Sequence, residues 1–243
     1  MTPNMSEFRS GAVSPVECLK AGWATIKDRY WLFLGMTLLA MLIGGAIPIV
    51  LIGPMMCGLY MCLLGKMRGE QVPFDRLFKG FDYFVPGLVA AAIQTLPVLI
   101  IVLAADAIFI AFTFSVVPHN RSEGPPAVFW VALSLFVLIA IAVSLVIQAL
   151  FLFAYPLIVD RKLSGWEAIK TSYRAATKNL GGILGLIFLN AGLGILGVLA
   201  CYVGVFFVMP VTFASYAAAY RQVFPETPQG FASPPPPPAS WAA

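Results

Sequence analysis

The sequence predicts an all-α membrane protein with six transmembrane helices, arranged as three parallel-oriented hairpins with amphipathic helices at the cytoplasmic membrane surface. The composition carries this prediction: 60% of the 243 residues are hydrophobic and only 11% are charged, with a mean hydropathy of +0.89. Soluble domains carry about 25% charged residues, so this chain has too few charges to cover a surface that faces water. The composition therefore excludes a soluble enzyme, a nucleic-acid-binding domain and a disordered protein.

Four long segments without any charged residue set the number of spans. They are residues 30–65, 83–105, 124–159 and 179–220. One span needs about 20 apolar residues, and the first and last segments are long enough for two helices, with Gly and Pro near their middles. The expected spans are about 31–48, 52–67, 83–116, 126–159, 180–199 and 202–221. The two middle spans are so long that they must tilt strongly or project beyond the membrane.

The distribution of positive charge predicts the orientation. If the N-terminus is cytoplasmic, every Lys and Arg except Arg121 falls on the cytoplasmic side of the six spans. Lys and Arg in short loops set the orientation of membrane proteins. We therefore expect both termini to be cytoplasmic.

Two amphipathic segments, 14–29 and 164–178, are predicted to lie at the membrane surface. Each begins with a capping-box pattern, Ser14 to Glu17 and Ser164 to Glu167. Their aromatic and basic side chains suit contact with lipid headgroups. The candidate contacts are Lys20, Trp23, Lys27, Trp166, Lys170 and Arg174.

A weak internal repeat connects these segments with the hairpins. Residues 22–27 resemble residues 165–170, and Pro54 to Tyr60 matches Pro210 to Tyr216. Residues 73–79 form a third, shorter lead-in helix before the middle hairpin. The repeat therefore consists of a lead-in helix followed by a hairpin.

The membrane domain covers residues 14–221, and the segments on either side of it are predicted to be disordered. These are residues 1–13 and the proline-rich tail 222–243, in which Pro234 to Pro238 favours polyproline II. The tail either binds an aromatic groove of a partner or is an unstructured extension.

Polar side chains inside spans are the candidate functional residues. Gln94, Asp106, Gln148 and Asn190 form a candidate intramembrane polar pathway. Such residues also serve as hydrogen-bonding glue between helices. On a straight helix Asp106 lies near the outer interface, where water solvates it.

No catalytic, metal or cofactor site is predicted. The single histidine, His119, lies in an outer loop, and Cys18, Cys57, Cys62 and Cys201 lack metal-ligand spacing. Motifs of hydrolases, nucleotide-binding proteins and metalloproteases are absent from the sequence.

Several short strings resemble a known group of proteins. They are Gly53 to Tyr60, Arg68-Gly69-Glu70, Asp75 to Phe81, Tyr155 to Arg161 and Gly165 to Ser172. These strings resemble a widespread bacterial family of uncharacterised multipass integral membrane proteins, loosely similar to the membrane domain of glycerophosphodiester phosphodiesterases. The resemblance implies a multi-pass protein of the bacterial cytoplasmic (inner) membrane. It transfers no phosphodiesterase activity, because the chain has no such catalytic domain.

Three functions are compatible with these features. The leading hypothesis is a non-enzymatic scaffold, assembly or envelope-homeostasis component, with another membrane protein or a second copy of itself as partner. The first alternative is a small permease or channel-like subunit, and the second is a protein that binds lipid headgroups. Membrane lipids are expected partners in every case, and nucleic acid is not.

Overall fold

The computed structural model describes residues 8–47, 49–116, 127–200 and 203–225, and within these ranges the chain forms helices and no strands. The elements lie close to the ranges expected from the Gly and Pro interruptions, except that Leu152 and Phe153 divide the expected helix 126–159 in two. They are α1 (Pro15–Ile26), η1 (Lys27–Arg29), α2 (Tyr30–Ala46), α3 (Ile52–Met67), η2 (Phe74–Tyr83), α4 (Phe84–Val116), α5 (Ala127–Phe151), α6 (Ala154–Arg161), α7 (Gly165–Lys178), α8 (Leu180–Leu199) and α9 (Gly204–Val223).

Four helical segments in the described ranges are long and apolar enough to cross a membrane. They are Pro15–Ala46, Phe74–Ala111, Ala127–Arg161 and Leu180–Leu199. The apolar helix α3 has only 16 residues, or about 24 Å, which is less than the roughly 30 Å of a bilayer core. Helix α9 has 20 residues but is not among the four. The count of six spans and the hairpin arrangement are therefore not confirmed and stay predictions.

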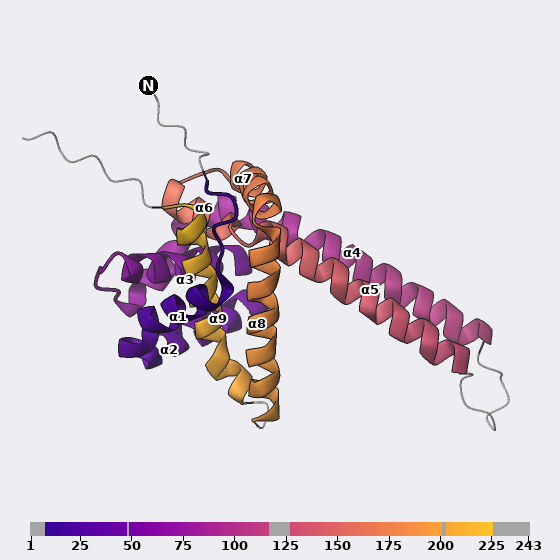
Figure 1. Ribbon diagram of the computed structural model, residues 1–243. Coiled ribbons are helices and arrows are strands. Elements are labelled where there is room, and N and C mark those ends of the chain that lie inside the picture. Colours follow the sequence, from indigo (N-terminus) through magenta and orange to yellow (C-terminus); the bar gives the residue numbers. More distant parts are fainter. Residues whose placement is uncertain (1–7, 48, 117–126, 201–202, 226–243) are drawn as a thin grey trace, which may run out of the picture.

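Helices α4 and α5 form a long arm that leaves the other helices, which we call the body. Figure 1 shows the two helices side by side, extending obliquely to α8. The 33 residues of α4 span about 50 Å. Beyond Pro97 most of its side chains are exposed, and so are those of the facing part of α5: Leu103 is 58% and Val131 68% exposed. We define the arm as residues 97–116 and 127–147, an apolar surface suited to lipid.

Helix α3 is largely buried in the body. It packs against η2 with little space between the two backbones. A Cβ atom on Gly58 would overlap the carbonyl of Leu77, and one on Gly80 would overlap the carbonyl of Pro54. Glycine at both positions therefore permits this close contact, because there is no space for a side chain between the two backbones.

Helix α1 lies along α9, so one side of the expected interfacial helix 14–29 is covered by protein, and its placement at the membrane surface stays a prediction. The two helices run antiparallel, as hydrogen bonds at either end show. Arg9 N–H, before α1, donates to the Val223 carbonyl (2.9 Å), and Tyr30 Oη, after α1, donates to the Phe207 carbonyl (2.6 Å). Between these points, a Cβ on Gly22 would lie 2.6 Å from the Ser215 nitrogen. Helix α1 packs against α9 through a second face, on which Cys18, Gly22 and Ile26 are buried. Only the opposite side, with Trp23 48% exposed, is free to meet lipid.

Residues 8–13 are held by hydrogen bonds, so the disorder predicted for 1–13 is wrong for this part. The buried Asn179 side chain donates to the Arg9 carbonyl (3.0 Å) and accepts from Ala12 N–H (2.9 Å). The predicted capping box at Ser14 is also wrong, because its side chain makes no cap; instead its N–H donates to Gln222 Oε1. Residues 1–7 and 226–243 of the expected termini lie outside the described residues.

The three lead-in elements share a glycine followed by an exposed aromatic residue. In each one the glycine lies against the backbone of a helix: Gly22 on α9, Gly80 on α3 and Gly165 on α4. The residues that follow them are Trp23, Phe81 and Trp166, and all are exposed. The Gly-Trp pair shared by the matching strings 22–27 and 165–170 therefore corresponds to a repeated packing contact, and Gly80-Phe81, just beyond the lead-in expected over 73–79, makes a third contact of this kind.

Candidate functional site

A cleft of about 350 Å³ opens where the arm leaves the body. Its walls come from α2, α3, α4, α5, α6 and α9, and Gln94 and Gln148 of the candidate pathway both line it. The lining residues are Met41, Ile52, Met56, Gln94, Thr95, Val98, Ser144, Ile147, Gln148, Tyr155 and Phe213. We call this the base cleft.

The base cleft is apolar with a few polar groups, none of them charged. Gln94 lies ten residues after the start of α4, about 15 Å along the helix, which is half the thickness of a bilayer core. Thr95 lies beside it, and Ser144 and Gln148 face it from α5. Within the described part of the chain, none of these four side chains has a hydrogen bond to a protein group. Such groups, in an otherwise apolar helical segment, are available to a ligand or to water.

The other two candidate pathway residues lie elsewhere. Asn190 is buried between α8 and α9 and donates to Ser215 Oγ (2.9 Å), which is the interhelical glue that such residues often provide. Asp106 is exposed on the arm, 12 residues or about 18 Å beyond Gln94. The four residues therefore do not form one pathway.

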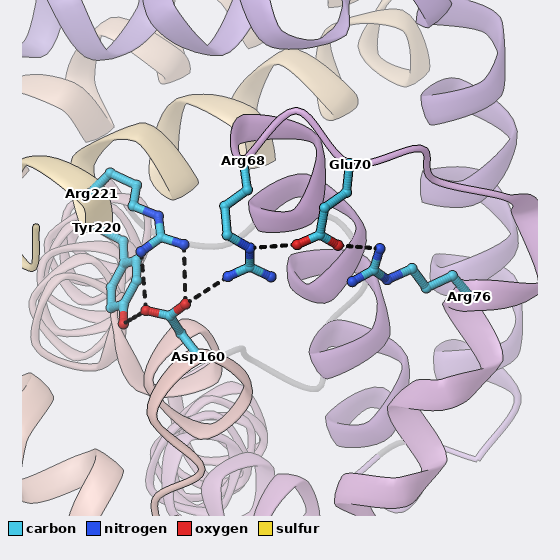
Figure 2. Close-up of polar contacts among 6 residues, drawn as sticks. All are labelled: Arg68, Glu70, Arg76, Asp160, Tyr220 and Arg221. Atoms are coloured by element: carbon cyan, nitrogen blue, oxygen red, sulfur yellow. Dashed lines mark hydrogen bonds and ion pairs between the residues drawn. The ribbon is translucent and has the colours of Figure 1, made fainter. Parts of the chain in front are cut away.

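A second polar feature is an ion-pair network that joins the ends of α3, α6 and α9 to η2. Asp160 of α6 accepts two hydrogen bonds from Arg221 of α9 (3.0 and 3.1 Å), one from Tyr220 Oη (2.8 Å) and one from Arg68 (3.0 Å). Arg68 also donates to Glu70 (2.7 Å), which pairs with Arg76 of η2 (2.6 Å). Figure 2 shows the resulting chain of charges. This Asp160 network connects α3, η2, α6 and α9.

The network is strongest at Asp160 and weaker at Glu70. The side chains of Asp160 and Arg221 are only 14% and 15% exposed, whereas that of Glu70 is 38% exposed. The hydrogen bond from Arg68, supported by Arg76, holds the pKa of Glu70 below its ordinary range. Gly69, between Arg68 and Glu70, has a φ of +78°, which glycine adopts without strain. The tight turn brings both side chains to the network.

The candidate lipid-contact residues are exposed on two separate helices. On α7, Trp166 is 55% exposed, and the Lys170 ammonium lies 5.1 Å from its ring centroid. The opposite face of this helix, including Ala168, Ser172 and Ala176, is buried. Lys170 and Arg174 are exposed on α7, as are Lys20, Trp23 and Lys27 on α1 and η1. The α7 capping box forms in part, because Ser164 Oγ accepts from Glu167 N–H (3.3 Å).

Sequence reasoning missed several residues that the fold brings together. Asp160 directly follows a charge-free segment and belongs to the string Tyr155 to Arg161, but no functional role was predicted for it. Its partners Arg68 and Arg221 are distant in sequence, so no spacing could reveal the network. In the base cleft, Thr95 was recognised as a polar residue within a span but not included in the candidate pathway, and Ser144 and Tyr155 were not identified.

In the described ranges, no group of three or more His, Cys, Asp or Glu side chains is arranged to hold a metal ion. Cys18, Cys57 and Cys62 are buried free thiols. Cys201, His119 and Arg121 lie outside the described residues. Comparison of the chain with protein-family models, curated proteins and solved structures gives no match.

Proposed function

We propose that this protein is a non-enzymatic, multi-pass membrane protein that binds an uncharged, lipid-like amphiphile in the base cleft. One observation carries the proposal: Gln94, Thr95, Ser144 and Gln148, together with Tyr155, line a cleft of about 350 Å³ whose other lining residues are apolar. Ligand sites typically have volumes of about 300–1,000 Å³, with apolar walls and a few polar groups that orient the ligand. The base cleft has this composition.

The lining indicates the chemical class of the ligand. Glutamine amides and hydroxyls both donate and accept hydrogen bonds, so they suit hydroxyl, ester or amide groups. With no charged side chain in the lining, a phosphate or ammonium group would lose hydration without a counter-charge. Diacylglycerol, with one hydroxyl, two esters and two acyl chains, has the chemistry that this lining favours.

The alternatives from the sequence are less well supported by the positions of their residues. A permease pathway through Gln94, Asp106, Gln148 and Asn190 would need these residues to meet, and only two of them share the cleft. A scaffold role for the exposed arm stays a prediction, as do the bacterial inner membrane and the cytoplasmic placement of both termini.

Native mass spectrometry of the detergent-purified protein tests the proposal. Diacylglycerol and phosphatidylglycerol with identical acyl chains are titrated onto the wild type and the Gln94→Leu/Gln148→Leu double variant. A hydrogen bond contributes about 0.5–1.5 kcal/mol net, so the double variant should bind diacylglycerol about tenfold more weakly.

Gln71→Leu, in an exposed loop, is the matched control and should bind like the wild type. Equal diacylglycerol affinity in the double variant and the wild type would contradict the proposal.

A further inference from the structure

Helix α7 lies between two of the segments that are long and apolar enough to cross a membrane. The first of these segments ends at Arg161 and the second begins at Leu180, and Figure 1 shows α7 beside the start of α8. A Cβ on Gly165, the first residue of α7, would lie 2.5 Å from the Pro86 carbonyl, near the start of α4. An amphipathic helix between the ends of two spanning segments lies at the surface of the bilayer.

One face of α7 is fixed against the rest of the protein. Ala168 and Ala176 are buried on this face. Ser172, also buried there, donates through Oγ to the Leu150 carbonyl (2.8 Å) and accepts from Phe153 N–H (3.2 Å). The fold therefore sets the direction in which the opposite, exposed face of α7 points.

The exposed face of α7 carries one continuous row of an aromatic and three basic side chains. The row consists of Trp166, Lys170, Arg174 and Lys178, all of them exposed. Residues four apart lie on the same face of a helix, and the three basic residues extend over about 12 Å. Tyr173, 51% exposed, is a second aromatic residue on this face. Trp and Tyr are enriched at the level of the lipid headgroups. We call these residues the α7 row.

The basic side chains of the α7 row have no carboxylate partner. Within the part of the chain that the structure describes, none of Lys170, Arg174 and Lys178 forms an ion pair. The single acidic residue of α7, Glu167, lies in its first turn and accepts from Ser164 Oγ (3.1 Å). A guanidinium binds phosphate through paired hydrogen bonds, and an ammonium binds it as a point charge. The α7 row therefore suits a surface of phosphate groups.

The other candidate lipid-contact helix differs in its charges. On α1 and η1, Glu17 and Asp28 lie exposed among the basic residues, and Asp28 pairs with Lys66. Lys20 and Lys27 therefore belong to a face of mixed sign and form no continuous positive row. This difference makes them a suitable control for the α7 row.

We infer that the α7 row binds the phosphate groups of anionic phospholipids at the bilayer surface, through Lys170, Arg174 and Lys178. This site is separate from the base cleft and does not depend on the function proposed for it. Its ligand is anionic, whereas the lining of the base cleft favours an uncharged one. Each cation near an anionic lipid surface contributes about fivefold in affinity.

Native mass spectrometry of the detergent-purified protein tests the inference with phosphatidylglycerol and phosphatidylcholine of identical acyl chains. The Lys170→Gln/Lys178→Gln variant should bind phosphatidylglycerol on the order of 25-fold more weakly, while phosphatidylcholine and diacylglycerol binding stay unchanged. Lys20→Gln/Lys27→Gln removes two exposed lysines at a similar spacing from α1 and η1, and should bind phosphatidylglycerol like the wild type. Unchanged phosphatidylglycerol binding in the α7 variant, or an equal loss in both variants, would overturn the site.

Fluorescence quenching in proteoliposomes is a second test, in a bilayer. Vesicles of phosphatidylcholine contain a small, equal share of either phosphatidylglycerol or phosphatidylcholine with brominated acyl chains, and the difference from Trp166→Phe isolates the Trp166 signal. Brominated phosphatidylglycerol should quench Trp166 more strongly than brominated phosphatidylcholine, and Lys170→Gln/Lys178→Gln should abolish this preference. Equal quenching of Trp166 by the two lipids in the wild type would contradict binding at the α7 row.

Discussion

Substitution of Asp160 by asparagine should destabilise the junction of α3, α6 and α9. The carboxylate accepts four hydrogen bonds, of 2.8–3.1 Å, from Tyr220, Arg221 and Arg68. Asparagine removes the charge and leaves two guanidinium groups facing each other. Removing one partner of a buried ion pair costs about 3–5 kcal/mol; because Asp160 is 14% and Arg68 31% exposed, we expect the lower end, about 3 kcal/mol.

The assay is thermal unfolding in detergent, followed by far-ultraviolet circular dichroism. For a chain of this size, 1 kcal/mol corresponds to about 2–4 °C in Tm, so Asp160→Asn should lower the Tm by about 6–12 °C. Asp82→Asn, at an exposed position of η2, is the matched control and should unfold like the wild type. A double-mutant cycle with Arg221→Gln should give a coupling energy of at least about 1 kcal/mol. Equal Tm values for Asp160→Asn and Asp82→Asn would refute the role assigned to the network.

Three further predictions concern packing and pH. Gly22→Ala should destabilise the protein by about 1–3 kcal/mol, because the new Cβ would lie 2.6 Å from the Ser215 nitrogen; Gly181→Ala, with no atom within 4 Å, should be close to neutral in the same unfolding assay. The ion pairs of Glu70 stabilise the fold above the ordinary carboxyl pKa of about 4.3, and this stabilisation is lost as the pH falls through the lowered pKa of Glu70. The Tm difference between the wild type and Glu70→Gln should therefore shrink on acidification. A Tm difference that stays constant would contradict the pairing. Asn190→Leu should lower the Tm by less in a Ser215→Ala background than in the wild type, because their mutual hydrogen bond (2.9 Å) is then already absent.

The helices were predictable from the sequence because their limits are local features. Apolar length, Gly and Pro interruptions and the Ser164 cap predict where they begin and end. The break at Leu152 and Phe153 has a local signal in Pro156, which lies in the first turn of α6 and removes the helical hydrogen bond to the Leu152 carbonyl, but the prediction of a single helix over 126–159 overlooks this proline. The break is also stabilised by a distant contact: Phe153 N–H donates to Ser172 Oγ (3.2 Å), which in turn donates to the Leu150 carbonyl (2.8 Å).

The position of α1 could not be predicted from its amphipathic pattern. The pattern predicts one apolar stripe, which includes Trp23, and indicates that this stripe faces the membrane surface. The face that decides the fold contains Cys18 and Gly22, whose small size becomes meaningful only when the α9 backbone lies against it. Hydropathy scores do not report such steric complementarity.

The candidate site was predictable only in part, because the sequence shows which residues are polar but not which of them helix packing brings together. Gln94 and Gln148 were identified as polar residues in apolar spans, which is a local property. Whether polar residues meet depends on helix packing, and this places Asn190 against Ser215 and Asp106 on the exposed arm. The Asp160 network joins residues from four elements, so its members were visible in the sequence only as separate charges.

Photolabelling in proteoliposomes tests most directly whether the base cleft binds an uncharged amphiphile. The probe is a diacylglycerol with a diazirine on one acyl chain, and the labelled residues are identified by peptide mass spectrometry. We predict labelling of the cleft wall at Met56 and Phe213 that exceeds labelling of the arm at Leu103, and that falls in the Gln94→Leu/Gln148→Leu variant while the arm signal stays constant. Labelling of the cleft no stronger than that of the arm, and unchanged in the double variant, would contradict the account.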